Sequence, residues 1–294
     1  MLAAAESKGW REAMLTSSNP KIKDLYLFTD CPSRADGSFY LSLTRESSVL
    51  DLGSGLGSYT FALSPRVKEI MAADTNFESL RFISLRARQD GRKNITAAQI
   101  EPLDYGRLPF ADKSFDAVIM NGVLEWVGAF LKRGDPLKIQ QKCLTEVRRT
   151  LKPGGEVWIG IENRFGLRYF MGTPDDHLTY YSKEKKTAYT SLLPRFIASW
   201  ITSRRLGRPY RTYTHSLWGL KRLLRRAGFA EMEFFFPEDD YRSISTKIIP
   251  LDSVEIRKII AQRMPNKLIG RVVAALKLET ALCDSYFIVA RERR

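Results

Sequence analysis

The residues with the clearest chemical signature are an acid and three glycines in the run Val49-Leu50-Asp51-Leu52-Gly53-Ser54-Gly55-Leu56-Gly57. Glycine tolerates backbone angles and close approaches that a side chain forbids, so a small ligand can lie directly against this turn. Asp51 would repel the pyrophosphate of a dinucleotide, and Ser58 breaks the G-x-G-x-x-G spacing of the dinucleotide fingerprint. The turn therefore favours an adenosine ligand that carries positive charge, such as a sulfonium with an ammonium group. A tight structural turn without a ligand is the alternative.

Strand-like and helix-like patterns alternate around this turn from about residue 48 to residue 164. We expect helices after Gly57, from the N-cap Asn76 to Gly91, and through Leu144 to a stop at 152–155. Further helices are expected at 217–227, 252–264 and 267–278. The expected strands are 49–52, 69–73, 95–100, 115–120, 157–161, 231–236 and 286–290.

This alternation predicts an α/β fold, a doubly wound, Rossmann-like and mostly parallel sheet of seven strands with helices on both faces and an insertion after the fifth strand. In such sheets ligands bind beyond the carboxyl ends of the strands. We divide the chain into an N-terminal helical cap or substrate region (1–47), a cofactor-binding core (48–164), a basic lid (165–215), and a C-terminal part of the same sheet with additional helices (216–294).

Composition limits the class of protein. The chain of 294 residues has three cysteines, Cys31, Cys143 and Cys283, which form no C-x-x-C pair. This pattern predicts reduced thiols, and neither a disulfide framework nor a metal site. The first ten residues include Glu6 and Lys8, and no apolar run reaches the roughly 20 residues that cross a bilayer. We therefore expect a soluble, cytoplasmic protein.

The net charge of +14 is concentrated between residues 182 and 226, where twelve Lys or Arg residues accompany one acid, Glu184. Such a basic surface favours an anionic partner, which can be nucleic acid, lipid headgroups or a phosphate-bearing substrate; a merely solvated face is the alternative. The segment 192–200, with the arginines that follow it, can rest on a membrane surface or pack as a lid helix.

Four segments together resemble the class I S-adenosylmethionine-dependent methyltransferases, and within them the small-molecule branch that includes quinone and sugar methyltransferases. The stretches IENRFGLRYFMGTPDDH (161–177) and FFFPEDDY (234–241) are similar to methyltransferases found with bacterial surface-polysaccharide enzymes. The four segments are VLDLGSGLG at 49–57, the acid Asp74, LPFADKSFDAVIMNGVLEWV at 108–127, and LTEVRRTLKPGGEVWI at 144–159.

The resemblance implies S-adenosylmethionine as the cofactor. Asp51 would face its cationic end, Asp74 would accept from both ribose hydroxyls, and Asp104 would accept from the adenine amino group. Asp74 as a helix-start residue and Asp104 as a loop acid are the alternatives. The residues implied to bind the cofactor are Asp51, Gly53, Ser54, Gly55, Gly57, Asp74, Thr75, Asp104, Asn121 and Gly122.

Methyl transfer needs a base only where the acceptor must lose a proton. His177 follows two acids in the insertion and is a candidate base, with Asp176 and Glu162 as rivals; a surface histidine in a polar loop is the alternative. Trp126 stands where related proteins often carry His, so we expect it to pack against cofactor or substrate.

The sequence thus predicts an S-adenosylmethionine-dependent O-methyltransferase for a small molecule such as a sugar or glycan precursor. An anionic or lipid-linked acceptor and a peripheral contact with the membrane would fit the basic segment. One alternative is an RNA methyltransferase that uses residues 182–226, where aromatic residues accompany the basic ones. Another is a non-catalytic scaffold with the same fold.

Overall fold

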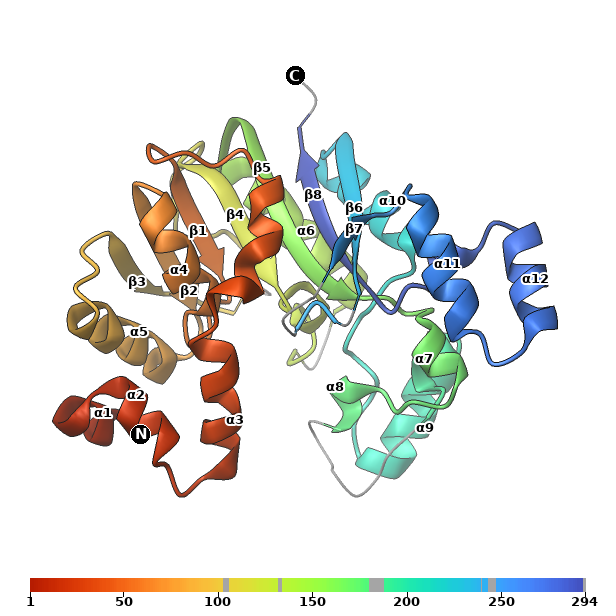
Figure 1. Cartoon of the computed structure of the whole chain (residues 1–294), viewed down its shortest axis with the longest axis horizontal. Coiled ribbons are helices and arrows are strands. Elements are labelled where there is room, and N and C mark those ends of the chain that lie inside the picture. The colour runs from red at the N-terminus through yellow and green to blue at the C-terminus, as the bar shows by residue number, and fades with distance from the viewer. Residues whose placement is uncertain (103–105, 132–133, 180–187, 239, 243–246, 293–294) are drawn as a thin grey trace.

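The computed structural model describes residues 1–102, 106–131, 134–179, 188–238, 240–242 and 247–292. Within these residues one mixed sheet of eight strands forms the centre of the molecule (Figure 1), in the order β3-β2-β1-β4-β5-β8-β6-β7. The strands are β1 (Ser48–Leu52), β2 (Glu69–Asp74), β3 (Ile95–Gln99), β4 (Phe115–Asn121), β5 (Leu151–Glu162), β6 (Glu231–Pro237), β7 (Ile248–Pro250) and β8 (Ser285–Arg291).

The expected doubly wound sheet is confirmed, with one more strand than expected. Strands β3, β2, β1, β4 and β5 pair in parallel, whereas β8, β6 and β7 continue the sheet with antiparallel pairings. The additional strand, β7, has only three residues at the edge of the sheet, which is too short to leave a pattern of alternating side chains.

Helices cover both faces of the sheet. Tyr59 and Leu63 of α4 pack with Val49 and Ile119 on one face, where α5 also packs on β2. On the other face Leu144 of α6 and Leu220 of α10 pack against alternate residues of the same strands. The α-helices that contribute to the two layers are α4 (Ser58–Leu63), α5 (Phe77–Gln89), α6 (Pro136–Thr150), α10 (Leu217–Ala227) and α11 (Val254–Arg263).

Local capping explains several helix boundaries. The side chain of Asn76 accepts hydrogen bonds from the backbone amides of Glu78 and Ser79, and Ser216 caps α10 in the same way. Gly228 ends α10 in the left-handed conformation, as the sequence predicts. At 152–155 the structure differs in detail, since α6 already ends at Thr150 and those residues belong to β5.

The remaining elements lie outside the two layers. The N-terminal helices pack on α5 through Trp10, whose ring contacts Phe82 edge to face. The segment between β5 and α10 forms short helices below the carboxyl ends of the strands (Figure 1). These elements are α1 (Leu2–Lys8), α2 (Trp10–Leu15), α3 (Pro20–Thr29), η1 (Pro32–Tyr40), η2 (Ser64–Arg66), η3 (Leu124–Trp126), α7 (Leu167–Phe170), α8 (Asp176–Thr179), η4 (Thr190–Leu192), α9 (Arg195–Leu206), α12 (Lys267–Ala275) and η5 (Glu279–Leu282).

Among the described helices, none combines the length and the apolar composition that crossing a bilayer requires.

Candidate active site

The glycine turn lies between β1 and α4, at the carboxyl edge of the parallel strands. Gly53, Gly55 and Gly57 have φ angles of +74°, +53° and +82°, which side chains rarely adopt. A Cβ atom on Gly53 would lie 2.5 Å from Cγ2 of Val123, whereas no neighbouring atom of the described residues lies within 4 Å of the Cβ position of Gly55. The turn therefore requires glycine, and it leaves open space beside its middle glycine.

Asp74, at the end of β2, holds this turn in place. One carboxylate oxygen accepts a hydrogen bond from the amide of Gly55 at 2.8 Å, and the other accepts from the amide of Asn76, also at 2.8 Å. Each oxygen of an ionised carboxylate can accept a second hydrogen bond. Because Asp74 is only half-buried, a bound diol can still reach both oxygens.

A cavity of about 380 Å³ opens from Asp74 along the edge of the sheet. Its polar end has Asp74, Thr75 and the backbone of Gly53, and its other walls are apolar. Such a division, with a hydroxyl-binding end and an apolar end, suits a nucleoside. The apolar walls are Ile100, Pro102, Val123, Trp126, Val127 and Phe130.

Asp51 lies beneath the turn. Its buried carboxylate accepts a hydrogen bond of 2.5 Å from the hydroxyl of Thr60, and burial raises its pKa to about 6. The nearby hydroxyl of Ser54 is buried with no partner among the described residues. Asp104 falls outside the described residues.

Asn121 and Gly122 end β4 directly beside the turn. The side-chain oxygen of Asn121 accepts a hydrogen bond of 3.2 Å from the hydroxyl of Tyr59. A Cβ atom on Gly122, whose φ is +71°, would lie 3.3 Å from the ring of Tyr241 and 3.8 Å from Oε1 of Glu125. The end of β4 therefore joins the glycine turn to a second group of polar side chains.

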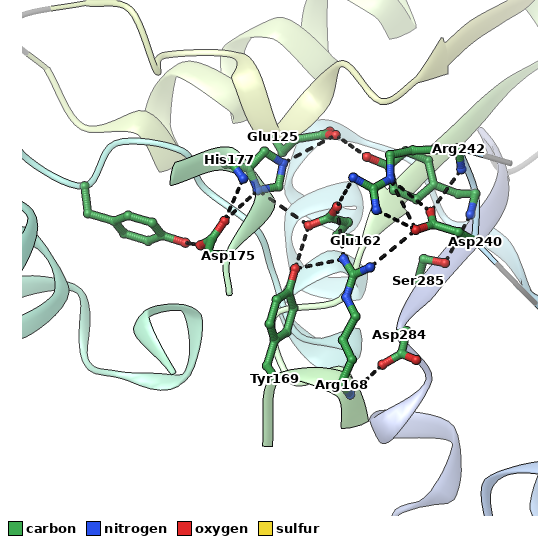
Figure 2. Close-up of polar contacts among 12 residues, drawn as sticks. Glu125, Glu162, Arg168, Tyr169, Asp175, His177, Asp240, Arg242, Asp284 and Ser285 are labelled. Atoms are coloured by element: carbon green, nitrogen blue, oxygen red, sulfur yellow. Dashed lines mark hydrogen bonds and ion pairs between the residues drawn. The ribbon is translucent and has the colours of Figure 1, made fainter. Parts of the chain in front are cut away.

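This second group is a cluster of four carboxylates, Glu125, Glu162, Asp175 and Asp240, with three cations, His177, Arg168 and Arg242 (Figure 2). Glu125, Glu162, Asp175 and His177 are buried, and the other three are partly exposed. We refer to these seven residues as the carboxylate cluster. Glu125 comes from η3 after β4, Glu162 ends β5, and His177 lies in α8 of the insertion. The topology thus brings the ends of two neighbouring strands and the insertion together.

His177 lies between three of these carboxylates. Its Nδ1 atom is 3.1 Å from Asp175 and 3.5 Å from Glu162, and its Nε2 atom is 3.9 Å from Oε1 of Glu125. Burial alone would lower the pKa of His177, but the attraction of Glu162, Asp175 and Glu125 raises it well above its usual value. The imidazole therefore carries its proton, and a positive charge, at neutral pH.

Both oxygens of Glu162 have close partners, although Oε1 has ion pairs and no hydrogen bond among the described residues. Oε1 lies 3.0 Å from Arg168 and 3.4 Å from Arg242, and Oε2 accepts a hydrogen bond of 2.7 Å from the hydroxyl of Tyr169. The side chain of Asp176, the other predicted rival for a base, is outside the described ones.

Glu125 differs from Glu162 in its charged neighbours, because its ion pair with His177, at 3.9 Å, is made by Oε1 and not by the oxygen that lacks a hydrogen bond. Oε1 accepts a hydrogen bond of 2.8 Å from the hydroxyl of Tyr241, whereas the buried Oε2 has no partner among the described residues. A buried carboxylate oxygen without a donor is costly, so it requires an explanation.

Arg34 brings a positive charge to the turn from the N-terminal region. Its Nη1 atom donates to the hydroxyl of Ser58, the first residue of α4, at 3.2 Å, and its buried Nε atom has no partner among the described residues. Burial lowers the pKa of this guanidinium. An anionic ligand group at the turn would therefore find a cation already in place.

Residues 50–159 match the model of the family described as methyltransferase domain. The matched segment begins in β1 and ends in β5, so it contains the glycine turn, Asp74 and Glu125. This match and the Rossmann-like sheet around it support a class I S-adenosylmethionine-dependent methyltransferase.

Curated relatives of this methyltransferase domain share only part of their length with it. A demethylmenaquinone methyltransferase of Tropheryma whipplei is 32% identical over 117 residues, which are 40% of this chain and 42% of that protein. A 23S rRNA uracil-C5 methyltransferase of Haemophilus influenzae is 31% identical over 84 residues, which are 28% of this chain and 19% of that protein. The chain spans less than half the length of the first relatives it matches.

The fold extends beyond the matched segment. A phosphoethanolamine N-methyltransferase of Haemonchus contortus, solved with S-adenosyl-L-methionine, superposes with a TM-score of 0.52. The superposition covers 97% of this chain and 60% of that one at 16% identity. At this identity the likeness establishes the fold alone, a Rossmann-like methyltransferase sheet.

Sequence reasoning placed Asp74, the three glycines, Asn121 and Gly122 along one edge of the sheet, and the structure brings them together. It did not identify Arg34 or Glu125 as site residues. An acid within the apolar segment Val123-Leu124-Glu125-Trp126-Val127 was the available signal for Glu125. Arg34 left no signal, because a 3-10 segment far from the turn delivers it.

The state of His177 predicts a pH dependence of stability for the protein. Its pKa is higher in the folded protein than the value of about 6.5 expected in the unfolded chain. The stabilisation is therefore complete below about pH 6.5 and is lost as the pH rises through the folded pKa, by at most about 1.4 kcal/mol per pH unit. Urea unfolding of the wild type between about pH 6.5 and 9 should reveal this fall, and His177→Gln should remove it.

His215→Gln is the matched control, because burial lowers the pKa of His215 to about 3 and places its pH dependence below pH 6.5. In this control the free energy of unfolding should still fall as the pH rises above about 6.5, as in the wild type. An unchanged slope in His177→Gln would contradict the assignment of an ionised imidazole.

Proposed function

We propose that the protein is a methyltransferase that transfers the methyl group of S-adenosylmethionine to a hydroxyl oxygen of a small molecule, such as a sugar or glycan precursor. The observation that carries this proposal is the buried Oε2 of Glu125, which has no donor among the described residues, in a carboxylate whose other oxygen would lie 3.8 Å from a Cβ atom on Gly122. Trp126, the next residue, lines the nucleoside-sized cavity, and its ring lies 5.1 Å from that of His177. The cavity and the carboxylate cluster therefore share a wall.

The residues at the turn fit the cofactor. Asp74 would accept both ribose hydroxyls, and Thr75 and the apolar walls of the cavity would enclose the base. The glycines would let the methionine part lie against the backbone beside Ser54, with its carboxylate toward Arg34. Asp51 beneath the turn would contribute negative charge toward the ammonium and sulfonium groups.

When bound, the cofactor supplies a methyl group already activated by its sulfonium. The chain would place the acceptor hydroxyl in line with it, next to Asn121 and Gly122. As the oxygen–methyl bond forms, the hydroxyl proton would pass to Oε2 of Glu125. The products are a methyl ether, S-adenosylhomocysteine and a protonated Glu125, which returns its proton to solvent.

Glu125 fits the role of base better than the residues expected from the sequence. His177 already holds its proton, so it would act on Glu125 through charge, as a positioning residue. Tyr241 would hold the other Glu125 oxygen in place. Glu162 would anchor Arg168, Arg242 and Tyr169, since both of its oxygens are engaged.

The charge of the site also bears on the acceptor. Among the described side chains of the carboxylate cluster, four acids face three cations, so a group with hydroxyl donors is favoured there over a phosphate. An anionic or lipid-linked part of the acceptor would be placed by its charge on the basic surface of α9 and α10.

Methylation of RNA is the second candidate. Trp200 and Trp218 are exposed on α9 and α10 next to arginines, where they could stack bases. One relative with partial coverage is an rRNA methyltransferase. A non-catalytic scaffold with the same fold is the third candidate. Cofactor binding alone does not exclude a scaffold, whereas transfer of the methyl group does.

Two variants test separately how the chain binds the nucleoside and the amino-acid part of the cofactor. Asp74→Asn should weaken binding of both S-adenosylmethionine and 5′-methylthioadenosine by about 2 kcal/mol, roughly thirtyfold, because a charge-assisted contact with the ribose is lost.

Arg34→Met should weaken the binding of S-adenosylmethionine by about tenfold or more. It should leave 5′-methylthioadenosine unchanged, since that nucleoside has no amino-acid part. Calorimetry with the two ligands measures this, and equal losses for both ligands in Arg34→Met would refute its assignment.

Transfer itself is tested with isotopically labelled S-adenosylmethionine, a small-molecule extract and total RNA, followed by mass spectrometry of each fraction. We expect the labelled methyl group in the small-molecule fraction as an ether. Glu125→Gln should lower its rate by about 100-fold or more with normal cofactor binding, whereas Glu46→Gln, a change at an exposed acid, should not. Label only in RNA would favour the second candidate, and cofactor binding without any labelled product would favour the scaffold.

A further inference from the structure

Helix α12 presents an apolar face to solvent. Leu268, Ile269, Val272 and Leu276 are 67%, 48%, 52% and 62% exposed, and no residue of the helix is buried. At 3.6 residues per turn these four side chains fall within roughly 100° of arc. We refer to them as the apolar face of α12.

The helix packs on the protein by a different side. It contacts α11, where Gly270 lies close to Met264, and Val273 is half-buried. Figure 1 shows α12 standing off from the sheet at one end of the molecule. The side chain of Asn266 caps its first turn, accepting from the amide of Leu268 at 2.7 Å. The helix is thus preformed, with its apolar face directed away from α11.

A second set of exposed apolar side chains lies on α9. Phe196 and Trp200, four residues apart and so on one face, are 76% and 59% exposed. Figure 1 shows α9 on the same side of the molecule as α12. Phenylalanine and tryptophan are suited to the boundary between water and acyl chains.

Both segments are basic. Residues 256–278 contain six Lys or Arg residues and no acid, and residues 185–230 contain eleven and no acid. Segments that combine exposed apolar side chains with an excess of cations are complementary to an anionic lipid surface, which accepts both.

We propose that α12, together with α9, docks the protein on an anionic lipid bilayer. A bilayer accommodates apolar side chains from separate helices at one level, without the continuous matching surface that a protein partner needs. A second copy would bring one basic surface against another, at a net charge of +14 for each chain. RNA would satisfy the cations but would leave the aliphatic side chains of α12 in water. The proposal stands apart from the proposed function, since it depends on no residue of the active site.

Flotation of the full chain with vesicles tests the proposal. We expect it to bind vesicles that contain phosphatidylglycerol and phosphatidylcholine, and not vesicles of phosphatidylcholine alone. Binding should weaken as salt is added. Equal binding to both vesicle types, or binding to neither, would overturn the proposal.

A matched pair of variants isolates the apolar face. Val272→Asp and Ala274→Asp introduce the same charge into α12, but Ala274 is exposed on the opposite side of the helix. Val272→Asp should weaken vesicle binding about tenfold more than Ala274→Asp does, because only Val272 inserts among the lipids. Both variants should keep the melting temperature and the S-adenosylmethionine affinity of the wild type, since neither site is packed in the core.

Three results would overturn the assignment. Equal effects of the two variants would leave the apolar face without a role. A dimer seen by light scattering that Val272→Asp dissociates would assign the face to a second copy. Binding of single-stranded RNA that Val272→Asp abolishes, with vesicle binding intact, would assign it to nucleic acid.

Discussion

The carboxylate of Asp74 holds the candidate site together. Its two oxygens fix the amides of Gly55 and Asn76, so one side chain joins the glycine turn after β1 to the start of α5. The parallel order of the strands makes this possible, because β1 and β2 end at the same edge of the sheet. The open space beside Gly55 and the cavity lined by Asp74 both border this connection.

The carboxylate cluster is the second constraint. Removing several carboxylates from water is unfavourable unless cations and hydrogen-bond donors accompany them. Here two arginines, a charged histidine and tyrosine hydroxyls do so for every carboxylate oxygen discussed except Oε2 of Glu125. A hydrophobic core would have been easier to form at this place. The carboxylate of Glu125, which carries this unpartnered oxygen, lies close to Gly122, where we place the reacting oxygen of the acceptor.

The parts of the fold with strong local signals could be predicted. The apolar strand 115–120 and the caps at Asn76 and Ser216 are local in origin, and the structure has them close to the predicted limits. The expected strand 157–161 is present within β5, which already begins at Leu151. The short strand β7 was missed, because three residues give no periodicity. The glycines and acids at the ends of the strands could also be predicted, because parallel strands end at the same edge of the sheet and so bring these residues together.

Residues that reach the site from other layers could not be predicted. Arg34 reaches Ser58 from η1, and Tyr241 reaches Gly122 from the segment after β6; only the tertiary structure brings these pairs together. The ionisation of His177 likewise depends on Glu125 and Glu162, which are distant in sequence. For His177 the sequence indicated a chemically important position, but the surrounding charges favour a positioning role over that of a base.

We propose that the cradle formed by the glycine turn and Asp74 holds the nucleoside of S-adenosylmethionine. A crystal structure with S-adenosylhomocysteine would show whether it does. We expect both ribose hydroxyls on the Asp74 carboxylate, the base among the apolar walls of the cavity, and the amino-acid carboxylate near Arg34. A ligand bound elsewhere, or a cradle filled by the protein's own side chains at saturating ligand, would contradict it.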